Sequence, residues 1–145
     1  SMCFGNPYNE EWNADIVLEW AEKIISLGIK NISLADTIGT SNPENISLLF
    51  SLLKKSFPEI NFGGHFHTRP ETAQEKILAA YDSGCRHFDS AIKGYGGCPM
   101  AMDSLVGNMP TERIVDFINE RKFFTEIDLN NFAECQKFST AVFEH

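Results

Sequence analysis

Long apolar runs, paired cysteines and basic clusters are all missing from this chain of 145 residues. No stretch approaches the ~20 apolar residues of a membrane span, so we expect no membrane partner. The four cysteines are widely spaced and form no CxxC pair, which is typical of free thiols in a reducing compartment and not of a zinc site or a disulfide framework. The 12 Lys and Arg residues face 20 Asp and Glu residues, a net charge of −8, and this acidic balance repels phosphate backbones. The sequence therefore predicts no nucleic-acid partner.

Signals for helices and strands alternate along the chain, which is 43% hydrophobic and long enough to form the core of one domain over residues 1–145. We expect strands at 31–34, 61–67 and 86–90. We expect four helices at 15–27, 72–83, 111–121 and 128–143. A further helix is expected to begin at 41–44 and to continue through residue 53. Such alternation is typical of βαβ units. The sequence therefore predicts an α/β fold with a parallel sheet.

Apolar side chains recur at helical spacing within the expected helices, which indicates the faces that they bury. In the second helix the stripe consists of Ile46, Leu49, Phe50 and Leu53. In the third helix we expect Ile77, Leu78 and Tyr81 to point inward. Cys85, which precedes a strand, and Cys135, which lies on a helix, are interpreted as core residues.

The start of the chain is unlike a natural N-terminus. Residues 1–4 are strand-like and run directly into the turn residues Gly5, Asn6 and Pro7. We expect either that Ser1 is a cloning remnant before Met2 or that the sequence is a piece of a longer protein.

Polar side chains follow the expected strands, where α/β folds place their sites. His65 and His67 are two residues apart on one strand, so both imidazoles point to the same face while Phe66 points to the other. A shared cation would relieve the repulsion between two such rings, and His is a common metal ligand. The pattern is short, so two ordinary polar residues at a strand end are an equal alternative. Asp36, after the first strand, is either a turn former or a catalytic carboxylate.

A glycine-containing loop follows the third strand, with Gly94, Gly96 and Gly97 leading to Cys98. Glycines let the backbone bring a thiol to a tip where neighbours can lower its pKa, although a surface loop that happens to hold a thiol fits the local sequence better. The loop lacks the third glycine of a phosphate-binding fingerprint. Asn108 either caps the following helix or offers an oxygen ligand.

Four motifs in one order carry a resemblance that decides between these alternatives. They are Ser33-Leu34-Ala35-Asp36-Thr37-Ile38-Gly39, His65-Phe66-His67, Gly94-Tyr95-Gly96-Gly97-Cys98-Pro99-Met100-Ala101 and Gly107-Asn108-Met109-Pro110-Thr111-Glu112. Together they resemble the C-terminal half of the 3-hydroxy-3-methylglutaryl-CoA lyase family, of the DRE-TIM metallolyase superfamily. The resemblance covers nearly the whole chain, and the Gly-Gly-Cys-Pro loop is its most specific element.

The resemblance implies a fold, a site and a reaction. The fold is the C-terminal half of a (β/α)8 TIM barrel, from the end of strand 5 through strand 8, followed by C-terminal helices. The family's metal ligands fall on His65, His67 and Asn108, and its catalytic residues fall on Cys98 and Asp36. The cofactor is then Mg²⁺ or Mn²⁺. The reaction is cleavage of an acyl-CoA substrate, 3-hydroxy-3-methylglutaryl-CoA, to acetoacetate and acetyl-CoA in leucine catabolism.

The sequence also departs from the family. Thr68-Arg69 stands where Asp-Thr commonly follows the second histidine, Lys93 replaces a small residue, and the segment from Cys98 to Asn108 is one residue longer than in some members. The family's Arg-Asp pair of strand 1 and glutamate of strand 2 have no place in a chain that matches from strand 5 onward. We therefore expect the isolated chain to be inactive, and to form a homo-oligomer or pair with a missing barrel half.

Two alternative functions stay open at this point. One is a non-catalytic half-barrel module that associates with itself or with another chain. The other is a related metal-dependent aldolase or acyl-CoA condensing enzyme, against which Cys98 argues. We expect a cytoplasmic location, or a mitochondrial one if a targeting segment precedes the chain.

Overall fold

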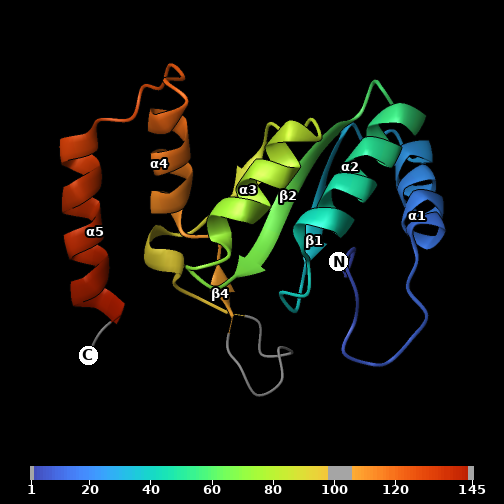
Figure 1. The fold of residues 1–145 in the computed structure, drawn as a ribbon, viewed down its shortest axis with the longest axis horizontal. Helices are drawn as coiled ribbons and strands as arrows, with labels where there is room; N and C mark the ends of the chain where they lie inside the picture. Colours follow the sequence, from blue (N-terminus) through green and yellow to red (C-terminus); the bar gives the residue numbers. More distant parts are fainter. Residues whose placement is uncertain (1, 98–105, 144–145) are drawn as a thin grey trace.

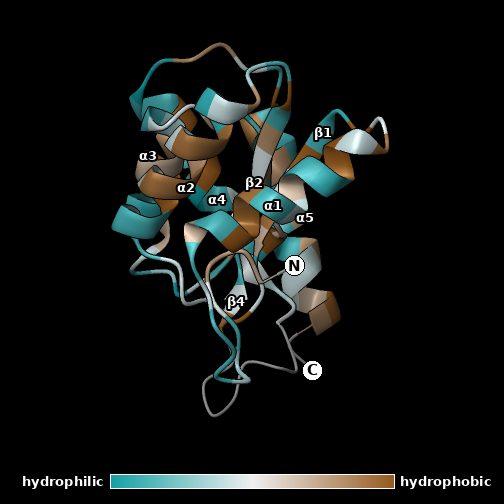
Figure 2. Ribbon diagram, turned by 90° about the vertical axis from the view of Figure 1, so that its right-hand side faces the viewer, coloured by the Kyte–Doolittle hydropathy of each residue, from teal (hydrophilic) through white to brown (hydrophobic). Residues whose placement is uncertain are grey.

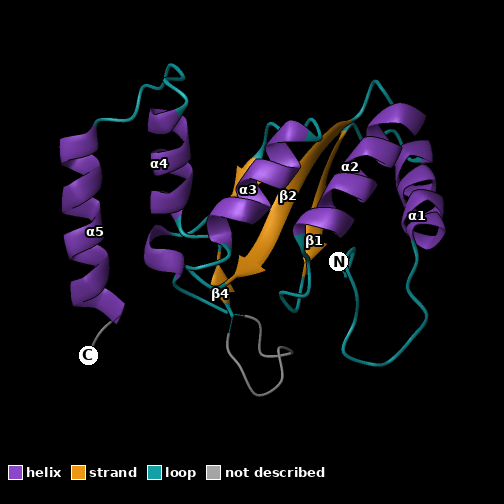
Figure 3. Ribbon diagram, viewed as in Figure 1, coloured by secondary structure: helices purple, strands orange, loops and turns teal. Residues whose placement is uncertain are grey.

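The computed structural model describes residues 2–97 and 106–143. Helices and strands alternate as the sequence predicts, and each expected element is present (Figure 3). The helices are α1 (Ala14–Ser26), α2 (Pro43–Ser56), α3 (Ala73–Asp82), α4 (Thr111–Glu120) and α5 (Leu129–Phe143), with a 3-10 turn η1 (Ile92–Gly94). The strands are β1 (Asn31–Asp36), β2 (Asn61–Thr68), β3 (Phe88–Asp89) and β4 (Gly107–Asn108).

Three parallel strands in the order β1-β2-β3 form the sheet, which confirms the predicted α/β class (Figure 1). In this register Ala35 lies opposite His65, and Asp36 lies opposite Phe66. The short strand β4 was not predicted. It pairs antiparallel with the end of β2, so that Asn108 lies opposite His67.

Helices α1, α2 and α3 lie on one face of the sheet, where the core lies (Figure 1). The predicted stripe of α2 is buried, and α2 and α3 both contact β2. Apolar and hydrophilic bands alternate around these helices (Figure 2). Asn42 caps α2 in a reciprocal capping box with Asn45, and Pro43 follows at the first helical position, so this helix begins where its sequence predicts.

Two predicted core positions are wrong. Leu78 is 38% exposed, and the buried side chains of α3 include Lys76, which is only 3% exposed. Cys135 is exposed, and α5 has no buried residue at all. This helix lies beside α4 and far from α1, so it does not contribute to the core (Figure 1). Cys85 is fully buried, as predicted.

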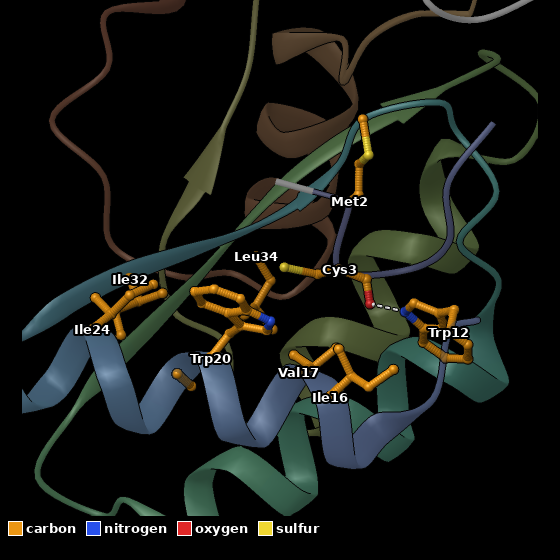
Figure 4. Close-up of a pocket in the computed structure, with 10 residues that line it drawn as sticks. Met2, Cys3, Trp12, Ile16, Val17, Trp20, Ile24, Ile32 and Leu34 are labelled. Atoms are coloured by element: carbon orange, nitrogen blue, oxygen red, sulfur yellow. Dashed lines mark hydrogen bonds between the residues drawn. The ribbon is translucent and has the colours of Figure 1, made fainter. Parts of the chain in front are cut away.

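The opposite end of the molecule holds an apolar groove between α1 and β1 (Figure 4). Cys3 runs beside β1, where its backbone N–H donates to the Ala35 carbonyl at 2.9 Å, and its own carbonyl accepts from the Trp12 indole at 2.8 Å. The groove has a volume of about 320 Å³, and Trp20 on its wall is 59% exposed. Among the described helices, none is both long and apolar enough to cross a membrane.

Candidate active site

His65 and His67 project from the same side of β2, as their spacing predicts. Their ring centroids are 5.4 Å apart, and the rings meet edge to face at 69°. The ring of Phe66 packs on the other side of the sheet against Phe4 and Phe50. The apolar packing of the residue between them therefore fixes the direction in which both imidazoles point.

A carboxylate from the neighbouring strand orients the first histidine. Asp89 of β3 lies opposite His65, and its Oδ2 is 3.2 Å from His65 Nδ1. The same oxygen accepts a hydrogen bond from Ser33 Oγ of β1. Holding Nδ1 in this way leaves Nε2 of His65 for a ligand, as in carboxylate–histidine–metal sites. Sequence reasoning missed Asp89; its only signal was its place at the end of the third strand.

The second histidine is buried, and burial favours its neutral form. Burial of the ring lowers the pKa of His67 below its ordinary value of 6.5; the nearby Val106 backbone opposes this shift, and the neighbouring His65 adds to it. Within the described part of the chain, His67 Nδ1 is buried without any hydrogen-bond partner. A buried unpaired polar atom in a native fold calls for an explanation such as a bound ion, and the neutral ring is the form that binds metals.

Asn108 lies beside the histidines because β4 pairs with β2. Its Nδ2 donates to the Tyr95 carbonyl at 2.9 Å, so that Oδ1 is left as an acceptor or ligand. The helix-cap alternative is wrong, because Pro110 occupies the N-cap position of α4 and no side chain caps that helix.

These residues fit a divalent cation. Two imidazoles and one amide oxygen form a mixed set of nitrogen and oxygen ligands that suits such ions as Mn²⁺. His67 Nδ1 has no hydrogen-bond partner among the described residues. Among residues 2–97 and 106–143, no three His, Cys, Asp or Glu side chains gather at ligand spacing. Within the part of the chain that the structure describes, the donor set for a metal is therefore His65, His67 and Asn108.

Glycines surround Asn108 closely. A Cβ added to Gly94 would lie 2.9 Å from the Asn108 carbonyl oxygen, and one added to Gly96 would lie 2.8 Å from its Nδ2. Both glycines have positive φ, 66° and 89°. Gly97 forms a bridge with Gly107. The predicted loop glycines thus hold β4 in place, whereas Cys98 lies outside the described residues.

Asp36 points away from the histidine pair, because it occupies the side of the sheet on which Phe66 packs. It is 1% exposed. Its Oδ1 accepts from the Ser41 backbone N–H at 3.1 Å, and its Oδ2 accepts from Ser41 Oγ and from Lys76 Nζ, the latter at 3.0 Å. The catalytic role of Asp36 stays a prediction, and the structure does not bring this carboxylate together with the two imidazoles.

Known proteins are similar to this chain in sequence and in fold. A hydroxymethylglutaryl-CoA lyase from Bacillus subtilis, YngG, is 33% identical over 138 residues, which are 95% of this chain and 46% of that protein. An (R)-citramalyl-CoA lyase from Chloroflexus aurantiacus is 33% identical over 128 residues, 88% of this chain and 40% of that protein. The structure of an HMG-CoA lyase from Acinetobacter baumannii with coenzyme A and 3-methylmalate matches with a TM-score of 0.87 at 34% identity, over 99% of this chain and 47% of that one.

The chain spans about half the length of these relatives. Its parallel sheet and helices match the HMG-CoA lyase fold, which confirms the resemblance found in the sequence. The HMGL-like family model matches residues 1–138. The chain therefore belongs to the HMGL-like family.

Proposed function

We propose that this chain forms the C-terminal half of a metal-dependent carbon–carbon lyase that cleaves 3-hydroxy-3-methylglutaryl-CoA to acetoacetate and acetyl-CoA. The observation that carries the proposal is the group of His65 and His67 at the end of β2 and Asn108 opposite them in β4, with a buried His67 nitrogen that has no hydrogen-bond partner among the described residues. The likeness to the YngG lyase of B. subtilis and to the A. baumannii lyase structure supports the substrate class.

The reaction requires two proton movements. The hydroxyl on C3 loses its proton, the bond between C2 and C3 breaks as the new carbonyl forms, and the electron pair moves into the enolate of the departing thioester. That enolate then takes a proton on carbon to give acetyl-CoA. A divalent cation, Mg²⁺ or Mn²⁺, held by His65, His67 and Asn108 would supply Lewis-acid polarisation of the substrate oxygens.

The residues of the chain divide this work. Asp89 holds His65 in one orientation, and the backbone pairing of β4 with β2 brings Asn108 beside His67. We assign proton donation to the enolate carbon to Cys98, onto which the resemblance places the family's loop cysteine. The contacts of Asp36 with Ser41 and Lys76 favour a supporting role over direct proton transfer.

A second substrate is favoured by one specific observation. The C. aurantiacus relative, named a citramalyl-CoA lyase, is as similar to this chain as the B. subtilis lyase is, at 33% identity. Assays of the active assembly, which contains this chain and a second barrel half, with both thioesters decide between them. If acetyl-CoA is released from citramalyl-CoA and not from 3-hydroxy-3-methylglutaryl-CoA, the proposed substrate is wrong, whereas the proposed reaction class is unchanged.

We also propose that the active assembly includes further strands, supplied by a barrel half of the same family. The edge of β1 and the apolar groove beside α1 are the surfaces that such a half would cover. The chain alone is then expected to give no detectable turnover, because loss of contacts to the substrate and metal reduces the rate tenfold for every ~1.4 kcal/mol.

The direct test is Mn²⁺ titration of the chain and of a His65→Ala/His67→Ala variant. The parent is expected to bind weakly and the variant not at all. Equal binding by the two proteins would refute the site. Acetoacetate release by the chain alone that disappears in Cys98→Ala would show that no second barrel half is needed.

A further inference from the structure

Lys76 is buried in the core beneath the candidate active site. It is 3% exposed, although lysine is almost never fully buried unless it is paired. Its ammonium donates to Asp36 Oδ2 at 3.0 Å, to the His67 backbone carbonyl at 2.9 Å and, at 3.4 Å, to the Gly39 carbonyl. An ammonium has three N–H donors, and the three acceptors around Lys76 Nζ match that number.

These three acceptors come from separate parts of the fold. Asp36 ends β1, Gly39 belongs to the turn that follows it, and His67 lies in β2, whereas Lys76 itself comes from α3. The ammonium therefore ties the ends of two strands and one turn to a helix on the covered side of the sheet. The carbonyl it binds belongs to His67, whose ring points to the candidate metal site.

We propose that Lys76, with Asp36 as its counter-ion, is a positioning residue for the metal ligand His67. This inference rests on the proposed function. The ammonium holds the His67 peptide at the point where β2 meets β4, and a ligand must be held within about 0.5 Å of its working position. Asp36 compensates the buried charge, and Ser41 holds that carboxylate in turn.

The alternative is that the ion pair stabilises the core and nothing more. A Lys76→Met variant alone does not separate the two, because it leaves Asp36 as an uncompensated buried charge and destabilises the fold. The Asp36→Asn/Lys76→Met double variant removes both charges, and a buried pair replaced by neutral side chains can keep its stability. Lys55→Met, which removes an exposed lysine from α2, is the matched control.

The first measurement is the Mn²⁺ affinity of variants that still unfold cooperatively. We expect the double variant to bind about 10- to 100-fold more weakly, as is typical when a group supporting a metal ligand is lost. Lys76→Arg, which keeps a buried cation with donors, is expected to recover part of the affinity. Lys55→Met should bind as the parent does. A cooperatively folded double variant with the parent's affinity would overturn the proposal.

The second measurement needs no metal. Ring ¹⁵N and ¹H shifts of His67, recorded at one fixed pH without metal, should change in the Lys76 variants and stay unchanged in Lys55→Met. If the parent fails to bind Mn²⁺, or if His65→Ala/His67→Ala binds equally well, the proposed function fails while this readout still tests the positioning. Unchanged His67 shifts in the folded double variant would overturn the positioning role by themselves.

Discussion

At the scale of single residues, Cys85 shows what burial does to a titratable group. Its side chain is fully buried, and its thiol donates to the His87 carbonyl at 3.1 Å. Burial raises the pKa of the thiol from 9.0 to about 11, because the thiolate would lose its hydration. The neutral thiol is therefore the form that the fold retains.

Cys85 should make the protein less stable at high pH. An unfolded chain ionises this thiol from its ordinary pKa of 9.0 upward, whereas the folded chain keeps it protonated until about pH 11. The contribution to stability is thus complete below pH 9 and is lost as the pH rises to 11, roughly 3 kcal/mol in all. Urea unfolding at pH 8, 9 and 10 measures it. Cys85→Ser, which keeps the volume and a donor but does not titrate here, should show a smaller loss; an equal loss would contradict the assignment.

The cysteines should also differ in reactivity. Brief alkylation near neutral pH is expected to modify Cys98, in its glycine loop, well before Cys85, whose raised pKa and burial protect it. Cys135 is exposed and should react as well, contrary to the expectation from its helical spacing. Mass mapping after a short reaction gives the order, and preferential labelling of Cys85 would refute it.

At the scale of elements, the 3-10 turn η1, which approaches Asn108 of β4, should tolerate no side chain at position 94. Gly94→Ala forces an alanine to positive φ and places its Cβ against the Asn108 carbonyl. We expect a loss of more than about 1 kcal/mol of unfolding free energy, together with weaker Mn²⁺ binding. Thermal unfolding and metal titration measure the two effects.

Gly28→Ala is the control for this change. Gly28 also has positive φ, at 88°, but a Cβ there would meet no atom within 4 Å. In this variant the unfolding free energy should fall only by the cost of holding an alanine at positive φ, and Mn²⁺ should bind as it does to the parent. Equal losses of metal binding in both variants would mean that contact with Asn108 does not explain the effect.

The elements whose formation depends on local sequence could be predicted. Asn42 and Pro43 start α2 where expected because capping involves residues close in the chain, and His65 and His67 share a face because strands alternate. The two-residue strand β4 could not be predicted, since it exists only through pairing with β2. Because β4 was not predicted, the sequence alone could not decide whether Asn108 caps a helix or offers an oxygen ligand.

The errors in α3 have a similar origin. Helical spacing favours Leu78 as a core residue, but in the structure Leu78 is exposed and Lys76 is buried. An acceptor group formed by Asp36, Gly39 and His67 offsets the cost of burying the ammonium, and it comes from residues 9 to 40 positions away in the chain. No pattern within a single helix reports such a partner. Asp89 was missed for the same reason, because its partner His65 lies on another strand.

At the scale of the whole molecule, the outer edge of β1, to which Cys3 contributes one backbone hydrogen bond, and the groove beside it favour association. Strand edges present unpaired N–H and C=O groups, and apolar patches drive contact between molecules. We expect dimers or larger species at micromolar concentration, measured by light scattering. A monomer under these conditions would count against the proposed pairing of barrel halves.

Two variants test whether molecules associate through the groove between α1 and β1. Trp20→Gln removes an exposed aromatic ring from the groove and should shift the chain toward the monomer. Leu27→Gln removes a more exposed apolar residue, 80% accessible, that does not line the groove, and should leave the association unchanged. Equal effects of the two changes would indicate nonspecific aggregation.

The antiparallel pairing of β4 with β2 also sets an order in time. His67 precedes Asn108, its partner in β4, by 41 positions, so both histidines are synthesised before Asn108 is added. A ribosome adds about 5–20 residues per second, so the intervening chain takes roughly 2–8 s to synthesise. During synthesis the two imidazoles are thus present in the chain before β4, the strand that brings Asn108 beside them.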